Sequence, residues 1–210
     1  MSSNPDSFID EVTEELRRDR LFAAFRKYGW IGITAILLIV GWSIWVEWSA
    51  ARKASLAQAY GDATLQALAN PGPAERKAAL AAVPARTPEQ AALLVLLAAE
   101  TPDAAPALAA LAADNGLAPA YRDLAAFRRL LLLTDMDPAE RAAGFEALAR
   151  PGAPFRMLAE EQLALIDIAA GRSDAAVVRL QAIAEDTGTT GALRRRAQQL
   201  IVALGGTPAN

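Results

Sequence analysis

One stretch in the second half of the chain has the pattern of two helices joined by a tight turn: Leu163-Ala-Leu-Ile-Asp-Ile-Ala-Ala-Gly-Arg-Ser-Asp-Ala-Ala-Val-Val-Arg-Leu-Gln-Ala-Ile-Ala-Glu-Asp186. Alanines on both sides of Gly171 allow the two helices to approach closely at the turn, and Leu180 and Ile183 give bulk to the packing face. Such a hairpin buries only one of its sides, so neighbouring hairpins must stack against it. The stretch therefore predicts an all-α protein, built as an α-solenoid of helical hairpins.

The pattern occurs a second time, 72 residues earlier. At this shift Leu108 aligns with Leu180, and the Asp-x-Gly sequence at 114–116 aligns with the one at 186–188. The register continues in three further pairs: Ala120 with Ala192, Arg122 with Arg194 and Ala125 with Ala197. A shift of 72 is close to twice the ~34-residue period of tetratricopeptide repeats. The repeat predicts a tetratricopeptide-like solenoid with two hairpins in each copy.

Proline and glycine divide the remainder of residues 49–210 into short helical pieces, because neither residue continues a helix interior well. The breaks fall at 70–73, 84–88, 101–103, 115–116, 134–138, 151–154, 171–172 and 187–191. No segment alternates apolar and polar residues as a strand would. We expect about eight helices after the anchor, the first of them a long helix over residues 50–68 that continues the apolar segment before it.

That apolar segment is Trp30-Ile-Gly-Ile-Thr-Ala-Ile-Leu-Leu-Ile-Val-Gly-Trp-Ser-Ile-Trp-Val46, which carries no charge. Its 17 residues rise ~25 Å as a helix, near the short end of what crosses the ~30 Å apolar core of a bilayer. Aromatic residues that favour membrane interfaces lie in or beside it: Tyr28, Trp30, Trp42, Trp45 and Trp48. The sequence predicts a transmembrane helix over residues 28–48, with these five residues as its anchor.

Basic residues are more numerous before this segment than after it. Arg17, Arg18, Arg20, Arg26 and Lys27 precede it, whereas only Arg52 and Lys53 follow closely. This bias places residues 1–27 in the cytoplasm and residues 49–210 on the far side of the membrane. A cleaved signal peptide is the competing interpretation, since residues 49–51 resemble a cleavage site. The long leader and the length of the apolar run favour an uncleaved anchor.

Residues 1–27 have the pattern of an amphipathic cytoplasmic helix. Ser7 and Asp10 have the spacing of a capping box, and Phe8, Val12 and Leu16 form one narrow apolar stripe. Such a helix lies on the membrane surface or docks on a partner, and the pattern leaves both open.

Composition excludes several classes of chemistry. The chain has no cysteine and no histidine, so it cannot form a Ser-His relay, a Cys-His pair or an ordinary zinc site. Its formal net charge of −3 gives no general attraction to nucleic acid. Adjacent acids at 160 and 161, with Asp167, are expected to form a solvated helix face rather than a catalytic pair. We therefore expect no enzyme, no cofactor and no metal.

Clustered arginines are the candidate contacts of a binding groove. Consecutive arginines on a helix point in different directions, so most are expected to be solvated. One or two can line the concave face and hold an acidic segment or a chain terminus. The candidates are Arg128, Arg129, Arg194 and Arg195. The large aromatic residues after the span, Tyr60, Tyr121, Phe127, Phe145 and Phe155, are expected to pack in the core.

Three stretches around the span carry a family resemblance: Phe25-Arg-Lys-Tyr-Gly-Trp30, Gly41-Trp-Ser-Ile-Trp45 and Ala54-Ser-Leu-Ala-Gln-Ala-Tyr-Gly-Asp-Ala63. In order and spacing, and with the turn Gly171-Arg-Ser-Asp-Ala-Ala176, they resemble the YfgM-type inner-membrane proteins. The resemblance implies a short cytoplasmic N-terminus, one anchor and a periplasmic tetratricopeptide-like domain. It also implies an accessory subunit of the SecYEG translocon, which works with periplasmic chaperones such as the PpiD-type foldase on emerging chains.

Topology and resemblance together favour a non-enzymatic scaffold or chaperone-type protein of a bacterial inner membrane. Its expected partners are the membrane, translocon subunits, a periplasmic foldase and secretory polypeptides, without nucleic acid. The alternative is a structural accessory subunit of another membrane complex, respiratory or division-related, in which the anchor matters more than the groove.

Overall fold

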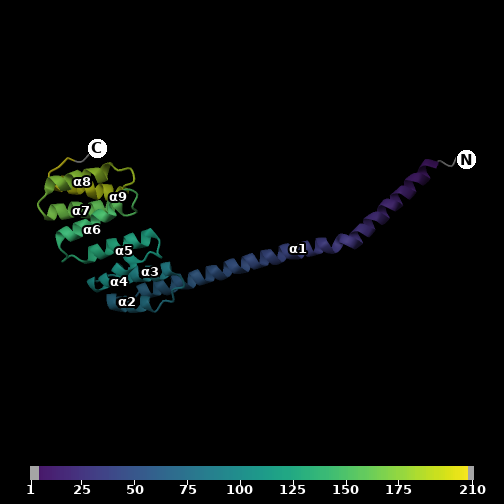
Figure 1. Ribbon diagram of the computed structural model, residues 1–210, viewed down its shortest axis with the longest axis horizontal. Helices are drawn as coiled ribbons and strands as arrows, with labels where there is room; N and C mark the ends of the chain where they lie inside the picture. The colour runs from purple at the N-terminus through teal and green to yellow at the C-terminus, as the bar shows by residue number, and fades with distance from the viewer. Residues whose placement is uncertain (1–4, 208–210) are drawn as a thin grey trace. The chain divides into compact units, whose positions relative to one another are not determined.

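The structure is a computed structural model (Figure 1) that describes the backbone of residues 5–207 and the side chains of residues 30, 31 and 34–207. The predicted stripe of Phe8, Val12 and Leu16, and the predicted anchor residue Tyr28, lie outside the described side chains. Within residues 5–207 the chain forms helices and no strand, so the all-α prediction is confirmed.

The α-helices follow one another with short connections. They are α1 (Pro5–Leu68), α2 (Pro73–Ala81), α3 (Pro88–Ala98), α4 (Ala105–Ala113), α5 (Pro119–Leu132), α6 (Pro138–Leu148), α7 (Arg156–Ala169), α8 (Ser173–Glu185) and α9 (Gly191–Ala203). A single 3-10 turn, η1 (Pro102–Ala104), precedes α4. Every predicted break coincides with a connection, and the helix predicted to end at residue 68 ends there.

Local sequence accounts for where the helices begin and end. Proline occupies the first position of α2, α3, α5 and α6, where its missing N–H costs no helical hydrogen bond. The Asp137 carboxylate accepts hydrogen bonds from the N–H groups of Ala139 and Glu140 at the start of α6. Gly171, with φ of +74°, ends α7, and the N–H of Arg172 donates to the Asp167 carbonyl at 2.8 Å.

The chain divides into two compact units, residues 1–59 and residues 60–210. The part of α1 that is long and apolar enough to cross a membrane lies within Thr34–Leu68. The prediction of one long apolar helix near the N-terminus is confirmed to that extent.

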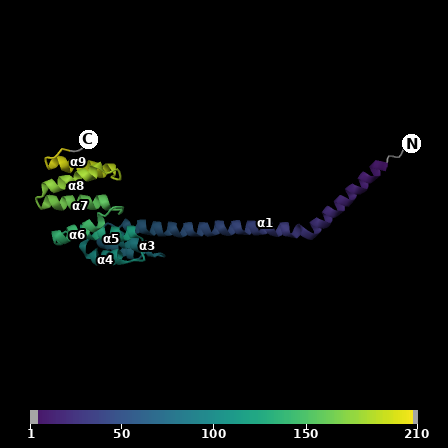
Figure 2. The same ribbon diagram turned by 45° about the horizontal axis from the view of Figure 1, so that its top comes forward.

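In the second unit, each helix packs chiefly on its neighbours in the chain. Its core consists of successive small clusters rather than one centre, beginning around Leu80 and ending around Leu180, Ile183 and Ile201. Both ribbon views show α5, α6, α7 and α8 side by side in chain order (Figures 1 and 2). The aromatic residues predicted to be in the core are buried or half-buried there.

The two predicted repeat copies share one local structure. Asp114, between α4 and α5, accepts a hydrogen bond from the Gly116 N–H at 2.8 Å. Asp186, between α8 and α9, accepts one from the Gly188 N–H, also at 2.8 Å. The aligned pairs Leu108 with Leu180 and Ala125 with Ala197 are fully buried in both copies. At these aligned positions the two segments therefore have the same turn and the same buried residues.

Candidate functional site

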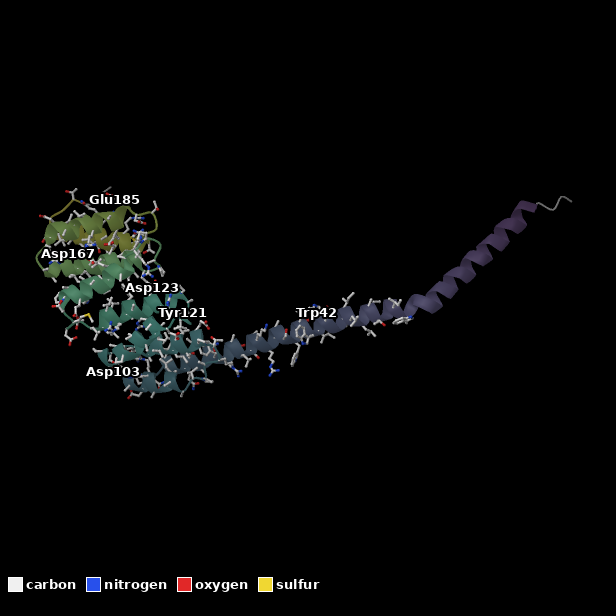
Figure 3. The ribbon with its side chains drawn as sticks, in the orientation of Figure 1. Trp42, Asp103, Tyr121, Asp123, Asp167 and Glu185 are labelled. Atoms are coloured by element: carbon white, nitrogen blue, oxygen red, sulfur yellow. The ribbon has the colours of Figure 1, made fainter. Side chains whose placement is uncertain are left out.

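The tryptophans of α1 lie on an uncovered apolar surface. Trp30, Trp42, Trp45 and Trp48 are each more than half exposed, as are Ile36, Leu37, Leu38 and Ile39 between them. Figure 3 shows Trp42 projecting away from α1. The Arg52 guanidinium lies 5.5 Å from the centre of the Trp48 ring, at the end of the charge-free segment. A helix that is apolar on every side is typical of a membrane span.

The hydroxyl groups within this segment are satisfied by the helix itself. Thr34 donates to the Trp30 carbonyl and Ser43 donates to the Ile39 carbonyl, each at 2.9 Å. An unpaired hydroxyl is costly in the apolar core of a bilayer, and this back-bonding removes that cost. The segment is therefore compatible with lipid at its polar positions as well as its apolar ones.

Two of the four candidate groove arginines bind the ends of neighbouring helices. Arg128 on α5 donates to the carbonyls of Leu96 and Ala99 at the end of α3, at 2.6 and 2.8 Å. Arg194 on α9 donates to carbonyls at and after the end of α8, including Ala184 at 2.9 Å. Carbonyls at a helix C-terminus lack helical partners and carry partial negative charge, so they bind guanidinium groups well. Both arginines join adjacent helices.

The other two candidates point to surface features. Arg129 is half-buried and lines a groove between α4, α5 and α6 with a volume of about 570 Å³, which we call the arginine groove. Arg122, Asp123 and Arg150 line the same groove. Arg195 is exposed on α9, beside Gln198, Gln199 and Val202, and does not line the arginine groove. The structure therefore does not bring the four predicted arginines to one site.

A second groove, between α2, α3, η1 and α4, is apolar. Its volume is about 340 Å³, and its lining includes Leu80, Leu94 and Val95. An ion pair between Lys77 and Asp103, 2.5 Å apart, also lines it. An apolar depression with one charged pair has the chemistry to accept an apolar side chain of a bound polypeptide. We call it the apolar groove.

The acids predicted to form a solvated helix face are instead largely buried. Glu161 is 6% exposed and accepts two hydrogen bonds from Arg196, at 2.8 and 2.6 Å. Asp167, which is labelled in Figure 3, is 8% exposed and accepts from Arg172 and Arg179. The solvated-face prediction was wrong for these two residues, because arginines from α9 and α8 reach across to α7.

Arg179 joins this network to Glu160. Its Nη1 donates to the Glu160 carboxylate at 2.8 Å and its Nε donates to Asp167 at 3.1 Å. Burial lowers the pKa of Arg179, but the hydrogen bonds to both carboxylates outweigh burial and hold the pKa above its ordinary value. Glu160 and Asp167 are seven residues apart, as are Arg172 and Arg179. This matched spacing, on two consecutive helices, is the sequence signal that would have predicted the pairing.

Ion pairs also make the fold sensitive to acid. The pKa of Asp186 is lowered by a hydrogen bond from Arg156, then by one from the Gly188 N–H. The pKa values of Glu100 and Asp103 are lowered by hydrogen bonds from Arg76 and Lys77 respectively. A carboxyl whose pKa is lower in the folded state stabilises the fold above its unfolded pKa, near pH 4. That stabilisation is lost as pH falls through the folded pKa values.

We expect Asp186→Asn to be less stable than the wild-type chain at pH 7, by an amount that shrinks as pH falls from about 5 to about 2. Asparagine can still accept from the Gly188 N–H, but it cannot form the ion pair with Arg156. Urea unfolding midpoints of both chains across this pH range check the expectation. A difference in stability that does not change with pH would contradict it.

Among the described side chains, no three His, Cys, Asp or Glu residues form a group that could hold a metal ion. The chain matches no family model, no curated protein sequence and no solved structure.

Proposed function

We propose that this chain is a bacterial inner-membrane protein with a single span, whose periplasmic helices form a tetratricopeptide-like solenoid that binds polypeptides. In this proposal it works as a non-enzymatic accessory factor of the SecYEG translocon, in contact with periplasmic chaperones or emerging chains. The observation that carries the proposal is the exposed apolar surface of α1 between Trp30 and Val46. In the described helices after α1, in contrast, most of the large apolar residues are buried or half-buried in the small cores between hairpins.

The packing of the second unit supports the solenoid. Its core clusters join helices that are neighbours in the chain, and the helix–turn–helix around Asp114 recurs around Asp186. Repeat proteins of this kind present extended surfaces for polypeptide partners. The apolar groove supports polypeptide binding because its volume of about 340 Å³ suits a large apolar side chain.

Site-specific photo-crosslinking in intact membranes tests the proposal. Probes are placed at Ile39 in α1, at Val95 in the apolar groove and at the exposed Arg195 on α9. Val178 is exposed on α8 and lines neither groove, so a probe there is the matched control.

We expect Ile39 to crosslink to translocon subunits, and Val95 or Arg195 to crosslink to secretory chains or a periplasmic foldase, above the level seen at Val178. Crosslinks from every position to one unrelated membrane complex would instead favour a structural accessory subunit. Crosslinks from Ile39 to soluble proteins alone would contradict the membrane span.

A further inference from the structure

The arginine groove has a floor of small side chains and a rim of positive charge. Alanines of α4, α5 and α6 line much of it, together with Leu130 and Leu148, and the Leu130 side chain packs tightly against Gly144. Arg122, Arg129 and Arg150 also line it, and they come from α5 and from the end of α6. A backbone can approach closely where the lining carries only the methyl groups of alanines.

The arginine groove carries an excess of positive charge, although the chain as a whole carries a net negative charge. Asp123 is the one carboxylate in its lining, and both of its oxygens accept hydrogen bonds from Arg150, at 3.1 and 3.0 Å. Arg122 and Arg129 therefore leave a formal excess of two positive charges, in a chain whose formal net charge is −3. A local positive field in an acidic protein selects acidic partners.

The guanidinium groups of Arg122 and Arg129 form few hydrogen bonds with other residues of the chain. Within the described residues Arg129 donates no side-chain hydrogen bond, and Arg122 donates one, to the Asn115 side chain at 2.7 Å. The Nε of Arg122 is buried without a partner. Arg194, the equivalent residue in the second copy, donates three hydrogen bonds to carbonyls. The first copy thus keeps guanidinium donors that the second copy uses to join α8 to α9.

We propose that the arginine groove binds an acidic, extended segment of a partner polypeptide, through the guanidinium groups of Arg122 and Arg129. A guanidinium presents paired donors that match the two oxygens of a carboxylate. The volume of about 570 Å³ exceeds what one small ion fills, and the small-residue floor accepts a peptide backbone. This inference specifies the partner chemistry within the proposed function and rests on it.

The test measures binding of short synthetic peptides with a neutral fluorophore to the purified full-length chain in detergent. One peptide alternates glutamate and alanine, and its matched control has glutamine in place of glutamate. We expect the glutamate peptide to bind about tenfold more tightly than the glutamine peptide, with an affinity that falls as salt rises. Arg129→Glu should weaken binding of the glutamate peptide by about tenfold or more, because it replaces attraction with repulsion.

Arg195→Glu is the matched control, since it makes the same charge change at an exposed position outside the groove. Arg129→Gln is the second variant, and thermal unfolding verifies that both Arg129 variants fold. Equal binding by the variants at 129 and 195, or equal binding of the two peptides, would overturn the proposal. Tighter binding of anionic vesicles or of an oligonucleotide of equal charge would also overturn it. The assay contains no translocon, so its result is independent of the crosslinking experiment.

Discussion

The double variant Leu38→Arg with Ile39→Arg is expected to leave the membrane. An arginine at the centre of a membrane span costs ~2.5–3.5 kcal/mol, so the pair costs about 5–7 kcal/mol. The charge-free segment has only 17 residues, so the free energy gained by inserting its apolar side chains is too small to offset this cost. Both side chains are about two thirds exposed, so the substitutions remove no packing within the described residues.

The matched control is Val178→Arg with Val202→Arg. These valines are similarly exposed, at 65% and 58%, but they lie on α8 and α9. Alkaline extraction of membranes, followed by quantification of the pellet, separates the two double variants. The α1 variant should be found mainly in the supernatant, whereas the control should stay in the pellet. If both variants stayed in the pellet equally, α1 would not be the anchor.

The helix boundaries could be predicted from sequence because they depend on local chemistry. Proline at the first position of a helix and glycine after its end act through their own backbone, within one turn. Gly171 illustrates this, because its positive φ and the hydrogen bond from the Arg172 N–H to the Asp167 carbonyl lie within one six-residue stretch of the chain. The repeat was predictable for the same reason, because each Asp-x-Gly turn is closed by a hydrogen bond across two residues.

The roles of the arginines could not be predicted in the same way. Arg128 binds carbonyls 29 and 32 residues away in the chain, and no local pattern specifies that distance. Arg122 and Arg194 align in sequence but differ in their partners. Asn115 supplies a side-chain oxygen to Arg122, whereas the aligned position of the second copy is Thr187, and Arg194 binds main-chain carbonyls instead. Because of this difference, Arg122 donates to one side chain, whereas Arg194 donates to three main-chain carbonyls.

Three phenylalanines form the core cluster between the two repeat copies. The Phe127 ring, on α5, lies 5.6 Å from the Phe145 ring in an edge-to-face contact and 5.9 Å from the Phe155 ring in a stacked one. Phe145, on α6, is fully buried. The first copy ends with α5 and the second includes α7 and α8, so this cluster is the main apolar contact across their junction.

Phe145→Ala is expected to destabilise the second unit by ~3–5 kcal/mol, because it removes a buried ring and leaves a cavity. In the proposed repeat array, stability depends on the contacts between neighbouring repeats, so a cavity at the junction should also uncouple the copies. Hydrogen exchange, measured on proteolytic peptides, is expected to give similar opening free energies for α3–α5 and α7–α9 in the wild-type chain. In the variant, the opening free energies of these two groups of helices are expected to differ. Phe145→Leu keeps most of the volume, so it should cost less and leave the copies coupled. Equal loss of protection in both copies of Phe145→Ala would show that the second unit unfolds as one cooperative body rather than as coupled repeats.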